Sequence, residues 1–426
     1  MAVRRIAVAC QGGGTHAAFT WGVLDEILLA KERFDADPAG GDTFEISAFS
    51  GTSAGALCAM AAWYGMAPNR ADAAMGSPAA ARERLDHLWT TFTATTPAEI
   101  LHNEWVAAAL RWQAGHLPTV SSGPYDLVSR LSMAGLSMMG VRPEYLGFPA
   151  LLHSLCPHLD DVDWPEVARR RLRVIAGAIE VLSGNTEIFD SDTTLRVMGL
   201  IEPDEYAGTG ANRWRMRRPL SLDGVAASGT LPEVLPAQRI PGMEFPTCEP
   251  GESVTRTGYY WDGLYSQNPP VRDLVDAPAR EDKPDEIWVV RINPQEFSPV
   301  SLDVSLDDIH DRENDLAGNL SLNQELDHIL TMNRWLDRYG DAHPPLDTRK
   351  RVEVRTIKMS RDTAWGIGHA SKLDRSAGHM ARLREEGREI GARWMEDWRR
   401  LGAEFDRYPD DARYPGSPGV APPGVR

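Results

Sequence analysis

Cysteine, basic residues and long apolar runs are all scarce in this sequence. Only 4 cysteines occur among 426 residues, and no two of them form a Cys-x-x-Cys pair. Scattered cysteines of this kind are typical of a reduced, cytoplasmic protein rather than a disulfide framework. The composition therefore predicts a cytoplasmic protein, and we expect neither a metal site nor a bound cofactor.

The shortage of positive charge excludes a further class of partner. Lys and Arg number 45 against 61 Asp and Glu, which gives a formal net charge of −16. Such a balance argues against nucleic-acid binding and against simple electrostatic adsorption to anionic lipid. No apolar stretch approaches the length of a membrane span, and the few apolar residues between Arg5 and Gln11 are too short for a signal peptide. We expect a soluble protein that remains where it is made.

The most informative stretch is Phe44–Gly55, which reads FEISAFSGTSAG. An apolar run leads into Gly51-Thr-Ser53-Ala-Gly55, and a helical segment rich in small residues follows at 56–64. Gly-x-Ser-x-Gly between a strand and a helix is the context of a nucleophile elbow, in which Ser53 is the nucleophile. A serine on so sharp a turn needs small neighbours, a requirement that Gly51 and Gly55 meet.

A second glycine cluster follows the short apolar strand predicted at Arg5–Cys10. Gly12, Gly13 and Gly14 come next, and a helical pattern begins at Ala18. Glycines between a strand and a helix leave bare N–H groups that can cradle a phosphate or a developing oxyanion.

The phosphate alternative fits this loop less well. A dinucleotide fingerprint needs an acidic residue at the end of a second strand. Asp35 and Asp37 have about the right spacing, but they lie in a loop, and the next strand ends at the Ser53 turn. No Gly-Lys-Ser/Thr follows the glycines, so the oxyanion interpretation is favoured.

A third cluster contains Asp262-Gly263, which on its own is an ordinary turn dipeptide. A serine nucleophile needs a group that accepts its proton. No histidine follows a late strand in an obvious loop. The proton acceptor therefore remains open on the residues alone, with Asp262 as one candidate.

Taken together, these clusters resemble the patatin-like phospholipases. Four segments match the family's motifs in order: Gly12–Leu24, with its three glycines and later Gly-Val-Leu; Gly51–Gly55; Ala226–Pro236; and Asp262-Gly263 followed by Asn268-Pro269. The resemblance implies an α/β fold with a central, mostly parallel sheet flanked by helices. It implies a Ser53–Asp262 dyad with Asp262 as general base, an oxyanion hole at Gly12, Gly13 and Gly14, and no cofactor.

The family's activity implies a serine acyl-ester hydrolase that acts on lipids or other esters. A carboxylesterase or an intracellular polyester hydrolase would need the same dyad, and a catalytically silent lipid-binding or scaffold protein is the alternative of another class. An intact Ser53 and Asp262 argue against the silent protein. Transient contact with a membrane surface, lipid droplet or granule would suit a lipid substrate.

Two positions depart from the family pattern. His16 and Ala17 stand where Arg/Lys and Gly are usual, and Leu264 replaces a small residue after Asp262-Gly263. A protonated His16 would partly replace the missing charge, whereas a buried first-turn histidine would have no part in binding. Leu264 bears on the width of the site.

The resemblance divides the chain into predicted regions. We expect a catalytic domain at 4–300 with a helical cap insertion at 68–165, a C-terminal elaboration at 301–405 and a disordered tail at 406–426. Apolar residues of the insertion, among them Trp89, Trp105 and Met133, would pack a core or line an acyl channel. A charged helix at 374–405, apolar along one side, is expected to dock or to form a homodimer rather than lie on a membrane.

Overall fold

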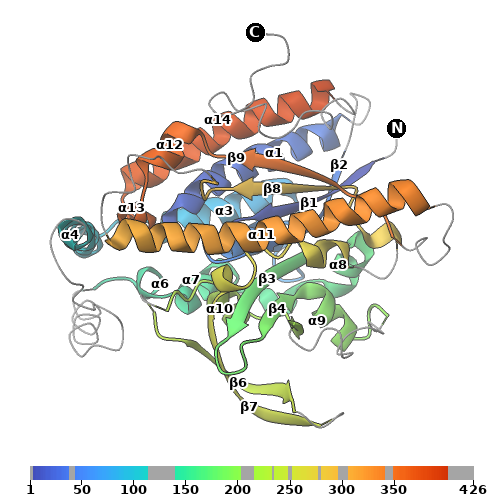
Figure 1. Ribbon diagram of the computed structural model, residues 1–426, viewed down its shortest axis with the longest axis horizontal. Helices are drawn as coiled ribbons and strands as arrows, with labels where there is room; N and C mark the ends of the chain where they lie inside the picture. Colours follow the sequence, from blue (N-terminus) through green and yellow to red (C-terminus); the bar gives the residue numbers. More distant parts are fainter. Residues whose placement is uncertain are drawn as a thin grey trace.

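The strands of this chain form one sheet with helices on both faces (Figure 1). The computed structural model describes residues 3–37, 44–113, 140–202, 215–232, 235–247, 252–276, 280–295, 306–340 and 349–401. Across these ranges the sheet has nine strands, with β5-β4-β3-β2-β1-β8-β9 in spatial order and β7 and β6 attached to β3. The strands are β1 (Arg4–Cys10), β2 (Phe44–Gly51), β3 (Arg173–Glu180), β4 (Thr186–Asp190), β5 (Arg215–Pro219), β6 (Gln238–Pro246), β7 (Ser253–Asp262), β8 (Glu286–Arg291) and β9 (Glu353–Lys358).

The helices cover the sheet from both sides. They are α1 (Ala18–Ala36), α2 (Ala54–Met66), α3 (Pro78–Phe92), α4 (Pro97–Gln113), α6 (Pro143–Leu146), α7 (Phe148–Leu155), α8 (Trp164–Arg170), α9 (Ser191–Val197), α10 (Leu222–Ser228), α11 (Leu306–Tyr339), α12 (Arg361–Gly366), α13 (His369–Lys372) and α14 (Ala377–Leu401). Short 3-10 turns include η1 (Gly14–Ala17) and η4 (Gly263–Tyr265).

The centre of the sheet is parallel, as the resemblance to the family implied. Neighbouring strands β3, β2, β1, β8 and β9 all run in the same direction. Parallel strands are buried on both faces, which explains the uninterrupted apolar runs of β1 and β8. Because the carboxyl ends of parallel strands meet at one edge, the loops after β1, β2 and β8 lie together there.

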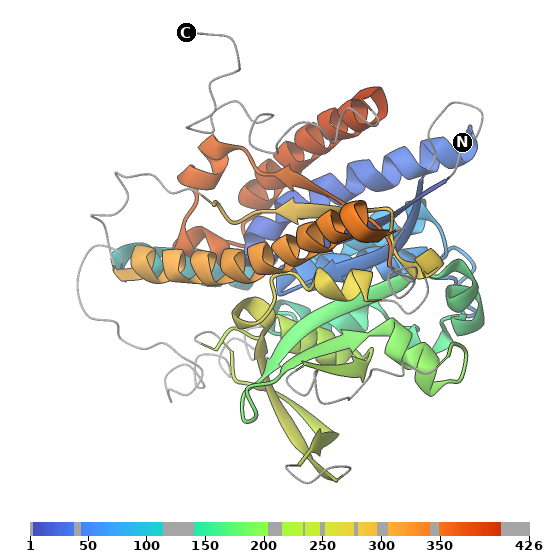
Figure 2. The same ribbon diagram turned by 45° about the vertical axis from the view of Figure 1, so that its right-hand side comes forward.

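Alternate residues of β1 belong to two different cores. Ile6, Val8 and Cys10 pack with α1, α2 and α14, whereas Ala7 and Ala9 face Leu322 and Ile329 of α11. Figures 1 and 2 both show α11 lying across the strands on its own face of the sheet. The β6–β7 ribbon projects away from this body in both views.

The C-terminal region, predicted as an elaboration, completes the central sheet. Strand β9 pairs in parallel with β8, and Trp394 and Trp398 of α14 pack on Trp288 of β8 at ring-centroid distances of 4.7 and 5.3 Å. Gly22 of α1 and Gly387 of α14 allow the two helix backbones to touch, since a Cβ on either would strike the opposite carbonyl oxygen. The apolar side of α14 therefore docks on its own chain.

Helix α3, in the described part of the 68–165 insertion, packs in the main core, whereas α4 does not. Leu85 and Trp89 of α3 are buried against α1 and α2 in the main cluster, while Trp105 of α4 is 62% exposed. Residues 114–139, which include Met133 and most of the other methionines of the insertion, lie outside the described residues. The tail at 406–426 lies outside them as well.

Candidate active site

Ser53 occupies the sharp turn between β2 and α2. Its backbone has φ 56° and ψ −134°, a left-handed conformation that is costly for a residue with a side chain. Its N–H donates to the carbonyl oxygen of Ser228 at 3.0 Å, which helps to hold the turn. A Cβ on Gly55 would approach the Gln11 carbonyl oxygen to 2.8 Å, and one on Gly51 would strike the Gly55 backbone. Both glycines are thus required by close packing of the turn.

Asp262 lies at the end of β7, a strand that runs toward the Ser53 turn in the direction opposite to β2. Strand β2 runs parallel to β3 and ends with Gly51 opposite Ala176. Strand β7 runs antiparallel along the same edge of β3 and ends with Asp262 opposite Ala178. The carboxyl ends of β2 and β7 therefore point at each other across Gly177. This arrangement brings Ser53 and Asp262 together.

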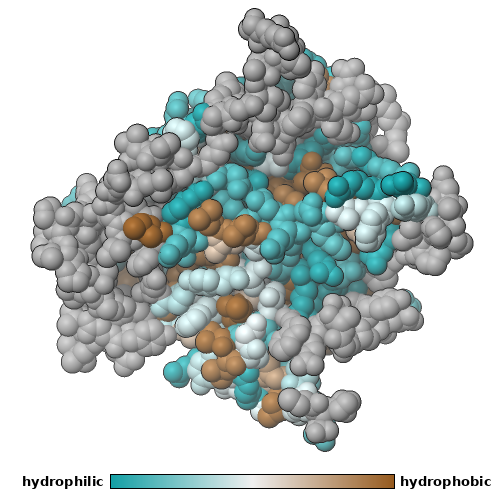
Figure 3. All heavy atoms as spheres, viewed as in Figure 1, coloured by the Kyte–Doolittle hydropathy of each residue, from teal (hydrophilic) through white to brown (hydrophobic). Residues whose placement is uncertain are grey.

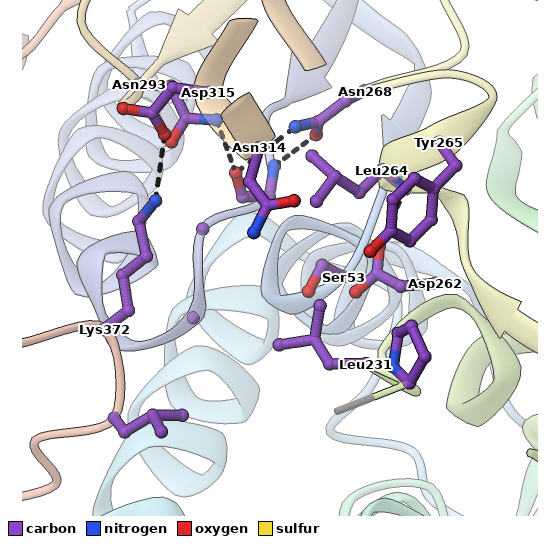
Figure 4. Close-up of a pocket in the computed structure, with 15 residues that line it drawn as sticks. Ser53, Leu231, Asp262, Leu264, Tyr265, Asn268, Asn293, Asn314, Asp315 and Lys372 are labelled. Atoms are coloured by element: carbon purple, nitrogen blue, oxygen red, sulfur yellow. Dashed lines mark hydrogen bonds and ion pairs between the residues drawn. The ribbon is translucent and has the colours of Figure 1, made fainter. Parts of the chain in front are cut away.

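The Asp262 carboxyl is fully buried. Burial raises its pKa to about 7, although the nearby Ser53 hydroxyl and the Leu264 N–H, which donates to Oδ1 at 2.8 Å, both lower it. Oδ2 has no hydrogen-bond partner among the described residues. The Ser53 hydroxyl lies beside the carboxyl without a fully formed hydrogen bond, as is common before a substrate binds (Figure 4). A carboxyl with a pKa near neutrality can accept and return a proton.

The glycine loop lies directly against the serine. A Cβ on Gly12 would come within 2.6 Å of the Ser53 Cβ. The Gly12 N–H already donates to Oδ1 of Asn268 at 2.7 Å. Gly13 and Gly14 are the N-cap and first residue of η1, where N–H groups have no intrahelical acceptor. Of the three predicted oxyanion residues, Gly12 is therefore anchored by Asn268, and the N–H groups of Gly13 and Gly14 remain as candidate donors.

These groups share one narrow pocket of about 70 Å³. Its lining residues are Gly12, Gly13, Gly14, Ser53, Leu231, Pro232, Asp262, Leu264, Tyr265, Asn268, Asn293, Asn314, Asp315, Lys372 and Leu373. Figure 4 shows Leu231, Leu264 and Tyr265 around the Ser53–Asp262 pair, with Asp315 and Lys372 on the far side of the glycine loop.

Sequence reasoning missed the polar residues on that far side. Lys372 Nζ donates to Asp315 Oδ1 at 2.9 Å, and Asn293 Nδ2 donates to the Gly12 carbonyl oxygen at 3.3 Å. Asn293 follows the carboxyl end of a parallel strand, a position that could have signalled a ligand contact. Asp315 and Lys372 lie in charged helical segments and gave no signal.

His16 does not line the pocket. It is 3% exposed, and its Nε2 lies 2.7 Å from the Ser371 hydroxyl in α13. The interpretation as a buried first-turn residue fits this placement. Leu264 does line the pocket, and its Cδ1 lies against Gly318 of α11.

Two further features were sought in the part of the chain that the structure describes. It holds no group of three or more His, Cys, Asp or Glu side chains that could bind a metal ion. It also holds no helix whose length and apolarity together would allow it to cross a bilayer.

A family model described as patatin-like phospholipase matches residues 8–275. The match covers more than half of the sequence, so this chain belongs to the patatin-like phospholipase family. The matched range ends before β8, and Asn293, Asp315 and Lys372 lie beyond it.

Two solved structures are distantly similar. VipD from Legionella pneumophila is 11% identical, with a TM-score of 0.37 over 93% of this chain and 67% of that chain. The ExoU–SpcU complex from the type III secretion system of Pseudomonas aeruginosa gives 11% identity and a TM-score of 0.27, over 93% of this chain and 52% of the other. This chain thus spans about half of the latter, and likenesses so remote carry no argument about function. A search among curated proteins gives no significant match.

Proposed function

We propose that this chain is a lipid acyl-ester hydrolase that works through a Ser53–Asp262 dyad. The observation that carries the proposal is the fully buried Asp262 carboxyl, with Oδ2 unpaired among the described residues, beside a serine on a strained strand-to-helix turn. Perturbed carboxyls beside a nucleophile are typical of active sites. The described residues that line the pocket include no histidine, and the other carboxylate among them, Asp315, is paired with Lys372, so Asp262 is the proposed base.

The proposed reaction proceeds through an acyl-enzyme. Asp262 accepts the Ser53 proton as Oγ forms a bond to the ester carbonyl carbon. The N–H groups of Gly13 and Gly14 donate to the resulting oxyanion. When the ester C–O bond breaks, Asp262 returns the proton to the leaving alcohol. A water molecule then gives a proton to Asp262, attacks the acyl-enzyme and releases the acid, and Ser53 recovers its proton.

Exposed apolar side chains support transient contact with a lipid surface. Tyr265, which lines the pocket, is 46% exposed. On α11, the helix that contributes Asn314 and Asp315 to the pocket, Leu316 is 39% exposed and Leu320 is 59% exposed. The space-filling view shows apolar residues separated by hydrophilic ones over this face (Figure 3). Such a surface suits brief, reversible contact rather than permanent insertion. Three buried free thiols, at Cys10, Cys58 and Cys156, fit a cytoplasmic site of action.

A substrate panel with the Asp262→Asn variant tests the proposal. Wild-type protein should hydrolyse p-nitrophenyl esters and lipid vesicles, with a preference among acyl chain lengths. The amide keeps the shape of the aspartate but cannot accept a proton, so kcat should fall by at least about 100-fold. Separate substitution of each histidine is the control. If one of these substitutions silences the enzyme and Asp262→Asn does not, a hidden Ser–His–Asp triad replaces the dyad.

A further inference from the structure

One wall of the pocket is polar, and its key residues lie outside the range that the family model matches. Asn293 follows β8, Asn314 and Asp315 belong to α11, and Lys372 ends α13. Three separate segments thus converge on the oxyanion loop from the side away from Leu231 and Tyr265 (Figure 4). Convergent polar groups in a mostly apolar pocket fix the orientation of a ligand.

The ion pair in this wall is held in place from behind. Lys372 pairs with Asp315 at 2.9 Å, and the Asp315 side chain is only 5% exposed. The Thr15 hydroxyl donates to the Ser371 carbonyl oxygen at 2.6 Å, and a Cβ on Gly14 would strike the Lys372 carbonyl oxygen. The backbone of Lys372 is therefore fixed against the oxyanion loop, and its ammonium group reaches the pocket from a defined position.

Asn293 provides a buried acceptor in the same wall. Its backbone N–H donates to Gln11 Oε1 at 3.0 Å, and its Nδ2 donates to the Gly12 carbonyl oxygen at 3.3 Å. These bonds orient the side chain, which is 6% exposed. Its Oδ1 has no hydrogen-bond partner within the described residues. A buried acceptor left unpaired is costly, so a ligand that donates a hydrogen bond to it would be favoured.

We propose that this wall binds the hydroxyl groups of a glycerol-type alcohol, the leaving group of the ester substrate. The inference rests on the proposed hydrolase function and names its substrate class. A hydroxyl group both donates and accepts, which matches acceptors at Asn293 and Asp315 beside the donor at Lys372. A bare phosphate dianion would instead meet the Asp315 carboxylate and the Asn293 oxygen, both of which repel it. The alcohol of a monoacylglycerol or a lysolipid fits, whereas a simple alkyl alcohol brings no second hydroxyl group to donate to Asn293 Oδ1.

Binding to the Ser53→Ala protein tests this site without any hydrolysis. The probes are 1-O-decylglycerol and decyl methyl ether, used below their aggregation concentrations in isothermal titration. The diol should bind at least about tenfold more tightly, as expected for one or two hydrogen bonds to charged or buried groups. The double change Lys372→Met with Asp315→Asn avoids a lone buried charge, and it should remove most of that preference. Asn293→Ser, a second and independent variant, should reduce it as well.

A kinetic ratio gives the corresponding result for catalysis. The kcat/KM for 1-decanoylglycerol divided by that for p-nitrophenyl decanoate should fall about tenfold in the double variant. Lys350→Met with Asp285→Asn removes another Lys–Asp pair, 2.6 Å apart and remote from the pocket, and should leave the ratio unchanged. Equal binding of the two ethers, or a ratio that is the same in all variants, overturns the polyol site. Loss of the hydrolase function would instead show as an inactive wild type that still prefers the diol.

Discussion

The backbone N–H of Gly12 donates a 2.7 Å hydrogen bond to Oδ1 of Asn268. This bond joins the glycine loop after β1 to the segment that follows the proposed base. It fixes the position of Gly13 and Gly14, the proposed oxyanion donors, relative to Asp262. The two motifs therefore act as one unit although they lie far apart in the sequence.

Asn268→Ala should lower kcat about tenfold or more while KM changes little. Loss of one buried hydrogen bond is worth about 1–2 kcal/mol, and here it loosens groups that contact the transition state rather than the bound ester. Steady-state kinetics on a p-nitrophenyl ester, with circular dichroism to verify folding, would measure this. Asn268→Asp keeps an acceptor and should be the milder change. A folded Asn268→Ala protein with wild-type kcat would show that the bond is dispensable.

Activity should rise with pH through about 7, because burial raises the pKa of Asp262 to that value and only the ionised form accepts a proton. Below this pH, kcat/KM should fall about tenfold for each pH unit. A profile from pH 4 to 9 on a neutral ester checks this. A midpoint near 4, the ordinary range for an aspartate, would contradict the burial of the base.

The same carboxyl should make folding less favourable as pH rises. The folded-state pKa lies above the unfolded value of about 3.8, so the folded protein holds a proton that the unfolded chain releases. Stability is then lost between about pH 4 and 7, by up to about 1.4 kcal/mol per pH unit. Relative to wild type, Asp262→Asn should gain about 2–3 kcal/mol between pH 5 and 8. Urea unfolding measures this difference, with the exposed Asp223→Asn as control, and parallel curves would refute it.

Glu325 of α11 should be a positioning residue for the segment around Asn268, the residue that anchors Gly12. Its Oε2 accepts from the N–H groups of Val271 and Arg272 at 2.6 and 2.9 Å, and its Oε1 accepts from the Gln267 side chain. Glu325→Ala would leave buried donors unpaired and should destabilise folding by about 2–3 kcal/mol.

Glu325→Ala should also lower kcat, because Asn268 lies in the sequence between Gln267 and Val271, both of which donate to Glu325. Glu325→Gln keeps an acceptor oxygen and should restore much of both losses. Asp327→Ala, an exposed change on the same helix, is the control. Loss of stability with no change in kcat would limit Glu325 to a structural role.

The sequence predicted those parts of the site that carry local signatures. The strand–turn–helix around Ser53 and the glycines after β1 can be recognised from their residue types and flanking patterns. The central strands can be recognised from their apolar runs. By contrast, β7 was not predicted as a strand, because its polar and aromatic residues form an exposed ribbon. The convergence of Asn293, Asp315 and Lys372 depends on how α11 and α13 pack, which no local pattern records. Likewise, α14 shows an apolar side whose partner, α1, only the fold reveals.

The most direct test of Ser53 as the nucleophile is covalent labelling by a fluorophosphonate probe together with ester hydrolysis, in wild type and in Ser53→Ala. The substitution removes only Oγ from a turn whose neighbours are small, so the protein should remain folded. We predict that wild type hydrolyses the ester and carries the probe on Ser53, as located by mass spectrometry, and that Ser53→Ala does neither. Hydrolysis by the variant within tenfold of wild type, or labelling at another residue, would contradict the account.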